Sequence, residues 1–468
     1  MKKLVFEAKI KLAASRHQVF AWHEAPSAFE RLAPPWVNME CVERSGGIQD
    51  GSRVVLVIHQ GPVGIPWVLG HKDYIKDEQF CDYQIAGPFA YWQQLHAVKD
   101  VVDSDGHIVG AELVDHVEFL PPLGLLGRIG GALFIKSELA RLFRYRHALM
   151  RRDLELQERY GKRPLKILVT GATGLVGSAF VPFMRSQGHT VLTMSRPQSG
   201  TAQSDGTGEL KWDPEAGTIA QELPGDLDAI VHLGGHNVAN QRWTVSEKQA
   251  IYESRIKSTT YLAQLIKAMP KPPATVVFAS AVGYYGNRGV EPLTEDSNAG
   301  EGFLADVCRD WEGSAELLKD SPVRVSFARI GAVLTPKGGA LAKMLPIFGA
   351  GGGGVVGSGK QYFPWVAMED VIGSLYHAIV EESVSGPFNV VAPQCVTNAE
   401  FTHAFARVLQ RPAIAPVKPV MLRALYGEMA DALMLASVRV LPQKLKQTGY
   451  QFAYGELAPA LKHMLGKG

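Results

Sequence analysis

The sequence predicts an α/β protein built on a doubly wound parallel sheet, preceded by a separate α+β domain. Three observations predict this. A glycine-rich strand–turn–helix pattern begins at Lys166, well inside the chain of 468 residues. After it, short apolar runs alternate with longer helical segments, as in a doubly wound sheet. Before it lie about 160 residues with several strand-like runs, enough for a domain of their own.

Composition excludes several classes of protein. Lys and Arg number 48 against 46 Asp and Glu, a formal net charge of +2, which gives no electrostatic case for a nucleic-acid partner. The four cysteines form no C-x-x-C pair, so we predict neither a metal site nor a disulfide framework. Charged residues interrupt the apolar N-terminal residues, which argues against a signal peptide. We expect a cytoplasmic protein with no membrane span.

Residues 1–157 are the predicted first domain. Its elements are predicted as a strand at 4–12, helices at 16–22 and 27–32, and strands at 53–59, 68–76, 81–86, 91–101 and 110–119. Apolar side chains then recur at helical spacing from Leu139 to Leu154, which predicts a long closing helix. A curved antiparallel sheet wrapped around one long helix suits this order. Residues 158–164, charged and ending in proline, are the predicted linker.

This order of elements resembles the SRPBCC, or START-like, family, and in particular its polyketide cyclase and aromatic-ligand branch. The resemblance implies a helix-grip fold with a mostly apolar cavity between sheet and helix, which would hold an apolar or aromatic ligand. A filled core is an equally weighted alternative, since aromatic residues on strands belong to a packed core more often than to the wall of a ligand cavity. The residues expected to line the cavity are Trp67, Phe89, Tyr91, Trp92, His96 and Phe119.

The second predicted domain, residues 165–468, opens with a dinucleotide-binding pattern. Lys166–Thr170 is a short apolar run typical of a buried parallel strand, and Gly171, Gly174 and Gly177 follow at G-x-x-G-x-x-G spacing. Gly171 permits a tight turn, Gly174 lets the backbone approach a pyrophosphate, and Gly177 lets the following helix pack closely. The helix N-terminus then faces the phosphates. A glycine-rich turn before an ordinary helix is the alternative, but the full context favours a cofactor loop. Its predicted cofactor-binding residues are Gly171, Thr173, Gly174, Leu175 and Val176.

The next strand, predicted at 190–194, indicates which dinucleotide binds. An NAD site usually ends this strand with Asp or Glu, which accepts hydrogen bonds from the ribose hydroxyls. Here the position holds Ser195, followed by Arg196. A carboxylate would repel a 2′-phosphate, whereas Ser and Arg bind one, so these residues predict NADP(H). The alternative is a solvated surface arginine.

The remaining alternation completes the doubly wound sheet. Strands are predicted at 229–233, 275–280 and 323–330, with helices at 247–269 and 305–318 between them. The final stretch is more helical and contains Leu441-Pro442. We expect it to form a small helical cap beside the C-terminal edge of the sheet.

Several segments of this half together resemble the extended short-chain dehydrogenase/reductase superfamily, with its Rossmann fold. They are closest to the atypical branch of NAD-dependent epimerase-like proteins. The segments are 170–177, 233–235, 279–286, 329–331, 363–366, Gln241–Thr244 and Ser254-Arg255. The resemblance implies cofactor contacts from Leu233, Gly234, Gly235, His236, Ala279, Arg329 and Gly331, and it places Ser280 at the catalytic edge of the sheet.

The catalytic positions depart from this family. Its working members use a Tyr-x-x-x-Lys pair, one helical turn apart, in which the Lys charge lowers the tyrosine pKa. The match puts Cys308 at the tyrosine position and Glu312 at the lysine position. A nearby carboxylate raises a thiol pKa, so Cys308 is expected to stay protonated. The remaining catalytic candidates are Ser280, Tyr284 and Tyr285, with structural roles as the alternative.

Two functional hypotheses follow. The first is an NADP(H)-binding oxidoreductase or epimerase-like enzyme acting on a small molecule, fused to a domain that captures an apolar ligand. The second is a non-catalytic sensor in which NADP(H) binding controls the fold. The missing Tyr/Lys pair favours the sensor, while the cofactor loop fits both hypotheses.

Overall fold

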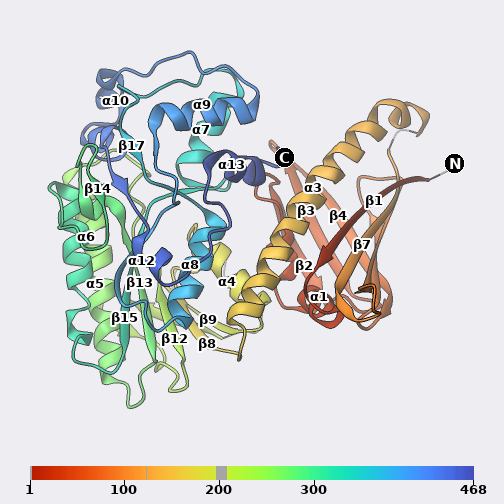
Figure 1. The fold of residues 1–468 in the computed structure, drawn as a ribbon, viewed down its shortest axis with the longest axis horizontal. Coiled ribbons are helices and arrows are strands. Elements are labelled where there is room, and N and C mark those ends of the chain that lie inside the picture. The colour runs from red at the N-terminus through yellow and green to blue at the C-terminus, as the bar shows by residue number, and fades with distance from the viewer. Residues whose placement is uncertain (1–2, 123, 197–207, 468) are drawn as a thin grey trace. The chain divides into compact units, whose positions relative to one another are not determined.

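The computed structural model describes residues 3–122, 124–196 and 208–467 (Figure 1). The chain forms two compact units. The first comprises Met1–Lys162 with Arg185–Gly188 and His463–Gly468, and the second comprises Arg163–Met184 and His189–Lys462.

The first unit is built on a seven-stranded sheet ordered β1-β7-β6-β5-β4-β3-β2, in which all neighbouring strands are antiparallel. Sequence patterns predicted every strand but β2, which lies at the edge, is mostly exposed and carries a bulge between Cys41 and Glu43. Such a strand shows no buried alternation for a pattern to detect. The bounds are β1 Leu4–Leu12, β2 Met39–Ser45, β3 Arg53–Gln60, β4 Val63–Ile75, β5 Gln79–Ala86, β6 Tyr91–Val102 and β7 Ile108–Leu120.

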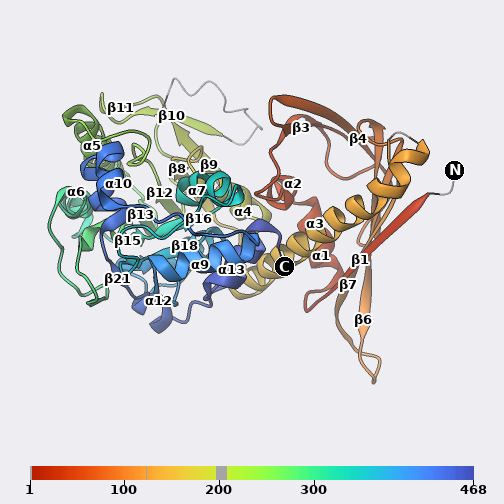
Figure 2. The same ribbon diagram turned by 90° about the horizontal axis from the view of Figure 1, so that it is seen from above.

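Three helices accompany this sheet: α1 Arg16–Glu24, α2 Ala28–Leu32 and the long α3 Gly124–Tyr160 (Figure 2). Leu139 and Phe143 of α3 pack on Trp92 and Phe119 of the sheet. Further along α3, Met150 and Leu154 join the cluster around Phe20 of α1 and Leu113 of β7. Since α3 ends at Tyr160, part of the predicted linker 158–164 is helical. None of the helices in the described part of the chain is long and apolar enough to cross a membrane.

The second unit confirms the predicted doubly wound sheet. Its eight strands are ordered β11-β10-β9-β8-β12-β13-β15-β19, and all neighbours are parallel except β10 and β11. Successive strands run outward from β8 in one direction and from β12 in the other, so the switch point lies between β8 and β12. The bounds are β8 Lys166–Thr170, β9 Thr190–Ser195, β10 Glu209–Asp213, β11 Thr218–Ile219, β12 Ala229–His232, β13 Thr275–Ala281, β15 Arg324–Ile330 and β19 Gly386–Val390.

Helices cover both faces of this sheet (Figure 1). On one face lie α5 Val245–Ala268 and α6 Phe303–Gly313, and Leu262 and Ile266 of α5 pack on Ile230 and Phe278. On the other face lie α4 Gly177–Ser186 and α8 Met368–Val380, which meet where the rings of Phe183 and Tyr376 approach to 5.8 Å. The predicted helix at 305–318 is interrupted after Gly313, and a short 3-10 turn, η2 Glu316–Leu318, follows.

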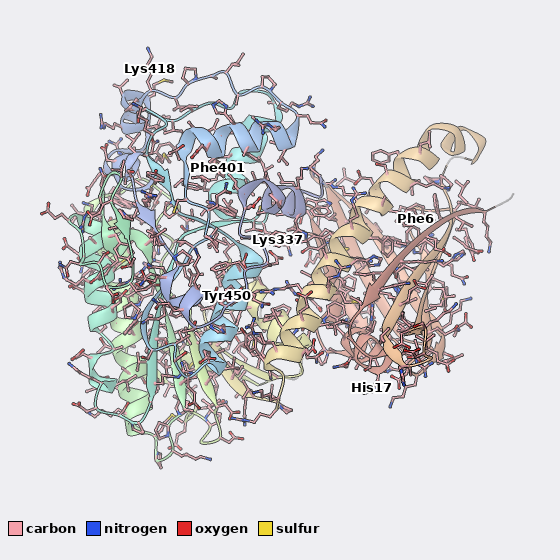
Figure 3. All side chains as sticks on the ribbon, in the orientation of Figure 1. Phe6, His17, Lys337, Phe401, Lys418 and Tyr450 are labelled. Carbon is pink, nitrogen blue, oxygen red and sulfur yellow. The ribbon has the colours of Figure 1, made fainter. Side chains whose placement is uncertain are left out.

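The predicted C-terminal cap is largely helical. Buried Asp370 of α8 ties this region to the sheet, since it accepts hydrogen bonds from the Tyr450 hydroxyl at 3.1 Å and from the backbone N–H groups of Ala453 and Tyr454 (Tyr450 is labelled in Figure 3). The smaller elements of the second unit are η1 Val282–Tyr285, β14 Pro292–Leu293, β16 Ala332–Leu334, α7 Gly339–Gly349, β17 Tyr362–Phe363, β18 Trp365–Ala367, β20 Val396–Thr397, α9 Asn398–Leu409, α10 Pro419–Tyr426, α11 Glu428–Ala430, η3 Asp431–Leu435, β21 Arg439–Val440, α12 Gln443–Gln447 and α13 Leu457–Leu465.

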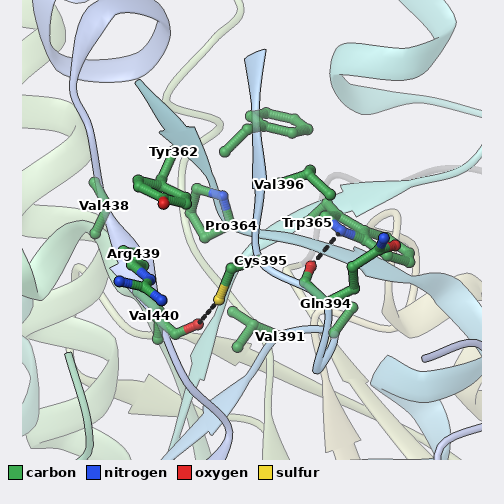
Figure 4. A pocket seen from close by; sticks show the side chains of 12 residues that line it. Tyr362, Pro364, Trp365, Val391, Gln394, Cys395, Val396, Val438, Arg439 and Val440 are labelled. Atoms are coloured by element: carbon green, nitrogen blue, oxygen red, sulfur yellow. Dashed lines mark hydrogen bonds between the residues drawn. The ribbon is translucent and has the colours of Figure 1, made fainter. Parts of the chain in front are cut away.

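A small pocket borders these C-terminal elements (Figure 4). The thiol of Cys395 donates a hydrogen bond to the Val440 carbonyl at 3.4 Å, and the Trp365 indole N–H donates to the Gln394 carbonyl at 3.0 Å. The pocket volume is about 10 Å³, which is room for at most one water molecule. The pocket is therefore part of the packing.

Candidate functional site

The predicted phosphate loop lies at the switch point of the sheet. Gly171 has φ +68°, and a Cβ on it would lie 2.7 Å from the Leu233 carbonyl carbon at the end of β12. A Cβ on Gly177 would lie 2.2 Å from the Gly171 oxygen. Only glycine therefore fits these two positions, one for the turn and one for the close approach of α4. Both roles agree with the sequence prediction.

The tip of the loop is exposed to solvent. Thr173 and Gly174 are exposed, and a Cβ on Gly174 would meet a single atom within 4 Å, the Gly171 oxygen at 3.2 Å. Within the described chain, the backbone N–H groups of Leu175 and Val176 have no hydrogen-bond acceptor. Unpaired N–H groups at a helix N-terminus are suited to bind phosphate oxygens.

Hydrogen bonds at the ends of β8 and β12 support this loop. The Thr170 hydroxyl and His232 Nδ1 lie 2.7 Å apart, and His232 Nε2 lies 3.1 Å from the Ser258 hydroxyl. Burial lowers the pKa of His232 to about 3, so the ring is neutral at physiological pH. Leu233 and Gly234 are half-buried and Gly235 is exposed, beside the loop. His236 was expected to meet the cofactor, and its Nε2 lies 2.8 Å from the buried Glu247.

Arg255 of α5 reaches the same place, and sequence reasoning assigned it no role. Its guanidinium carbon lies 4.9 Å from the ring centroid of Trp311. It is also close to Gly235, since a Cβ on that glycine would lie 3.3 Å from it. It donates a hydrogen bond to the Ile251 carbonyl at 2.8 Å, and burial lowers its pKa. A cation beside the glycine pair is suited to an anionic group of cofactor or substrate. The resemblance of Ser254-Arg255 to the family was the available signal.

The end of β9 carries more charge than its sequence indicated. The Ser195 hydroxyl donates to Glu209 and accepts a hydrogen bond from Lys211 Nζ at 2.9 Å. Lys211 reaches it because β10 pairs with β9 in the register that sets Lys211 opposite Ser195. Arg196 is exposed and forms an ion pair with Glu215 at 3.4 Å. Ser195 is thus flanked by an ion pair of the adjacent strand, Lys211 with Glu209 at 2.7 Å, which local sequence did not reveal.

Ser280, at the end of β13, takes part in a buried polar network. Its hydroxyl donates to Glu312 Oε1 at 2.7 Å. Arg329 of β15 donates to both Glu312 oxygens at 2.8 Å, and its side chain is 3% exposed. Burial acts to lower the pKa of Arg329, but Glu312 raises it above its usual range. Glu312, which the sequence analysis matched to the family's lysine, is therefore the acidic partner of a buried ion pair.

The two tyrosines of η1 have different surroundings. Tyr285 is fully buried, its hydroxyl donates to Asn389 Oδ1 at 2.7 Å, and Arg329 Nη1 donates to it at 3.0 Å. Burial raises the pKa of Tyr285 to about 12. Tyr284 is half-buried, with its ring centroid 3.5 Å from the Arg329 guanidinium carbon. Of the pair, Tyr284 is the more exposed.

Replacing Tyr285 with Phe is expected to lower the free energy of unfolding by about 1–3 kcal/mol, because Asn389 and Arg329 each lose a buried partner. Tyr284→Phe, the matched control, is expected to change stability little, since its hydroxyl has no hydrogen bond to the described chain. Chemical denaturation of both variants measures the difference. Equal stabilities would contradict the structural role of Tyr285.

Cys308 is buried beneath η1, and burial raises its pKa to about 12. Arg255 opposes this shift and Glu312 adds to it. The expectation of a protonated thiol agrees with this direction, but burial rather than Glu312 is its main cause.

Two other residues predicted to contact the cofactor, Ala279 and Gly331, are closely packed. Ala279 is buried in β13, with 8% of its surface exposed. A Cβ on Gly331 would lie 2.4 Å from the Pro364 oxygen, so glycine is needed there for close packing of the backbone.

The first unit contains a cavity of about 440 Å³ between sheet and helix, within the range of small-molecule sites. Its wall includes four of the six residues expected there, Trp67, Phe89, Trp92 and His96. Phe119 is instead fully buried in the core, and Tyr91 lies outside the wall with Lys3 Nζ 3.9 Å from its ring centroid.

Comparison with known proteins places the second unit in a family. Residues 167–303 match the NAD dependent epimerase/dehydratase family, and residues 419–464 match a domain of unknown function, DUF1731. Epimerase family protein Mb2239 of Mycobacterium bovis is 40% identical over 295 residues, covering 63% of this chain and 96% of the relative. The chain belongs to the epimerase family.

Two solved structures extend the comparison. Human epimerase family protein SDR39U1, solved with NADPH, has a TM-score of 0.59 and 35% identity, covering 64% of this chain and 99% of that one. A nucleoside-diphosphate sugar epimerase from Corynebacterium glutamicum has a TM-score of 0.77 and 30% identity, covering 98% of this chain and 90% of that one. This epimerase-family member therefore has a solved relative that also matches its first unit.

Proposed function

We propose that the second unit is an NADP(H)-binding oxidoreductase or epimerase-like enzyme acting on a small molecule. The open phosphate loop at the switch point, with the unpaired N–H groups of Leu175 and Val176, carries this proposal. Membership of the epimerase family and the NADPH in the human relative support the choice of cofactor.

The geometry supports a set of proposed cofactor contacts. The loop residues Gly171 to Val176 hold the pyrophosphate, Leu233 to His236 border the adenosine side, and Ser195 and Arg196 hold the 2′-phosphate. We add Lys211, which donates to Ser195. Ala279, Arg329 and Gly331 are assigned to shaping the strand ends, because burial or backbone packing occupies them.

NADPH is expected to bind more tightly than NADH. Arg196→Ala and Lys211→Ala are each expected to weaken NADPH binding by on the order of 1.5–3 kcal/mol, since each removes a charge-assisted phosphate contact. Calorimetric titration measures this, and NADH is the matched control because it lacks the 2′-phosphate. Unchanged NADPH affinity in both variants would refute the assignment.

For chemistry, we propose Ser280 and Tyr284 as the catalytic groups and nucleoside-diphosphate sugars as the first substrates to test. The substrate class comes from the Corynebacterium glutamicum relative. Arg255, beside Gly235 and near Cys308, is suited to an anionic substrate group. The test is sugar interconversion in the presence of NADP+ and NADPH oxidation by keto derivatives of such sugars, with NADPH affinity measured on the same preparation.

A second candidate function is a non-catalytic NADP(H)-dependent sensor. The observation that favours it is the Glu312 network, which binds Ser280 and Arg329 where the family has its lysine. If NADPH binds tightly and a broad panel shows no turnover, the sensor is the better account.

For the first unit, we propose a START-like ligand-binding domain spanning residues 1–157, joined by a linker at 158–164 and holding an apolar or aromatic molecule. The antiparallel sheet, the long α3 and the cavity between them support this. We propose a cytoplasmic location for the whole protein, in line with its four free cysteines. Native mass spectrometry of the purified protein would detect both a retained cofactor and a cavity ligand.

A further inference from the structure

The cavity of the first unit has an apolar part and a charged part. Aromatic and aliphatic side chains such as Trp67, Phe89 and Leu139 form most of its wall. The wall also contains Arg146 of α3 and, on neighbouring strands of the sheet, His71, Asp82 and His96. An occupant that matches both parts has an apolar body and a polar end.

Arg146 is the charged group without an acidic partner. Its recorded hydrogen bond within the described chain runs from Nε to the Leu32 carbonyl at 3.3 Å, and no described carboxylate lies within 4.0 Å of its guanidinium. Arg31 of α2, by contrast, binds Asp153 through two bonds of 2.9 and 2.8 Å. Burial lowers the pKa of Arg146, because the charged guanidinium is less stable away from water. A bound anion would stabilise the charged form.

Each of the two nearby carboxylates contacts two histidines. Asp115 lies 2.6 Å from His96 Nδ1 and 2.7 Å from His147 Nε2. Asp82 lies 3.1 Å from His71 Nε2 and 3.5 Å from His96 Nε2. Burial opposes ionisation of His96, yet Asp115 and Asp82 raise its pKa to about 9. Asp115 and Asp82 also raise the pKa of Arg146 against the effect of burial, but no described carboxylate lies within 4.0 Å of its guanidinium.

Two further atoms of the wall have unused hydrogen-bonding capacity. The indole Nε1 of Trp67 and Nδ1 of His71 are both buried and have no hydrogen-bond partner. The indole N–H can only donate. Because both atoms are buried, neither is offered to an occupant of the cavity, and the polar end of an occupant would meet Arg146.

We propose that this cavity binds an apolar molecule that ends in a carboxylate, with the carboxylate on Arg146 and the apolar body against the aromatic wall. This proposal rests on the proposed ligand-binding role of the first unit and specifies its ligand class. A guanidinium binds a carboxylate through two parallel hydrogen bonds, and the half-buried position of Arg146 strengthens the attraction.

The test uses the full-length protein and the neutral fluorescent probe N-phenyl-1-naphthylamine, displaced by dodecanoate or by 1-dodecanol. These competitors have the same chain length and differ in charge. Dodecanoate is expected to displace the probe at a concentration at least about tenfold lower than dodecanol. Arg146→Gln is expected to abolish this preference while binding the probe normally. Arg44→Gln is the matched control, since Arg44 also lines the cavity but is paired with Glu30 at 3.4 Å.

The outcomes separate two failures. If the probe binds but dodecanoate and dodecanol compete equally, or if Arg146→Gln keeps the preference, the carboxylate inference is wrong and the binding domain stands. If the probe does not bind the wild-type protein, both are wrong. Dodecyltrimethylammonium, with a cationic end, requires no variant, and displacement by it at the dodecanoate concentration would also overturn the inference.

Discussion

Replacing Gly174 with Val is expected to weaken NADPH binding at least about 100-fold, close to 3 kcal/mol, while the protein stays folded. A branched side chain at the tip of the phosphate loop would occupy the space that a pyrophosphate needs. The fold should tolerate it, because Gly174 is exposed and a Cβ there would meet one atom, the Gly171 oxygen at 3.2 Å. Calorimetric titration and a thermal melt of the same preparation measure the two effects.

Two other glycines are matched controls. Gly225 is exposed in a loop, and a Cβ on it would meet nothing within 4 Å, so Gly225→Val should change neither binding nor melting. Gly177→Val should disrupt the fold itself, since a Cβ there would lie 2.2 Å from the Gly171 oxygen. If Gly174→Val binds NADPH as the wild type does, the phosphate loop has been assigned to the wrong segment.

The sequence predicted the elements whose side chains alternate between buried and exposed surroundings or are uniformly buried. Strand β8 begins and ends where the apolar run Lys166–Thr170 does, because a central parallel strand is buried on both faces. The same reasoning did not predict strand β2, because its residues are mostly exposed and show no buried pattern. It also extended the helix at 305–318 through Gly313, where the structure changes to a 3-10 turn.

The candidate site was predictable where function depends on local backbone geometry. Gly171 and Gly177 are required by a turn and a close approach within the same short segment. Lys211 and Arg255 were not predicted, because strand register and helix packing bring them to the site from distant positions. Glu312 was expected beside Cys308, but its pairing with Arg329 joins α6 to β15 and leaves no local pattern.

That pairing leads to the largest expected loss of stability. Arg329→Met is expected to lower the free energy of unfolding by about 3–5 kcal/mol, because Glu312 would remain buried without its cation. The side chains of Arg329 and Glu312 are 3% and 13% exposed, so water compensates little. Chemical denaturation measures the loss. The exposed pair of Arg309 and Asp306 is the control, and Arg309→Met should change stability little.

The double variant Arg329→Met/Glu312→Leu distinguishes a buried ion pair from a network that also acts in catalysis. With both charges gone, no unpaired buried charge remains, so most of the lost stability should return. In this variant the Ser280 hydroxyl at the end of β13 would lose Glu312, its hydrogen-bond acceptor. If stability returns and NADPH affinity is unchanged, Arg329 supports the strand and does not contact the cofactor. If stability returns but NADPH binding is lost, the Arg329–Glu312 pair contributes to the cofactor site, in line with the cofactor contact that the family resemblance implies for Arg329.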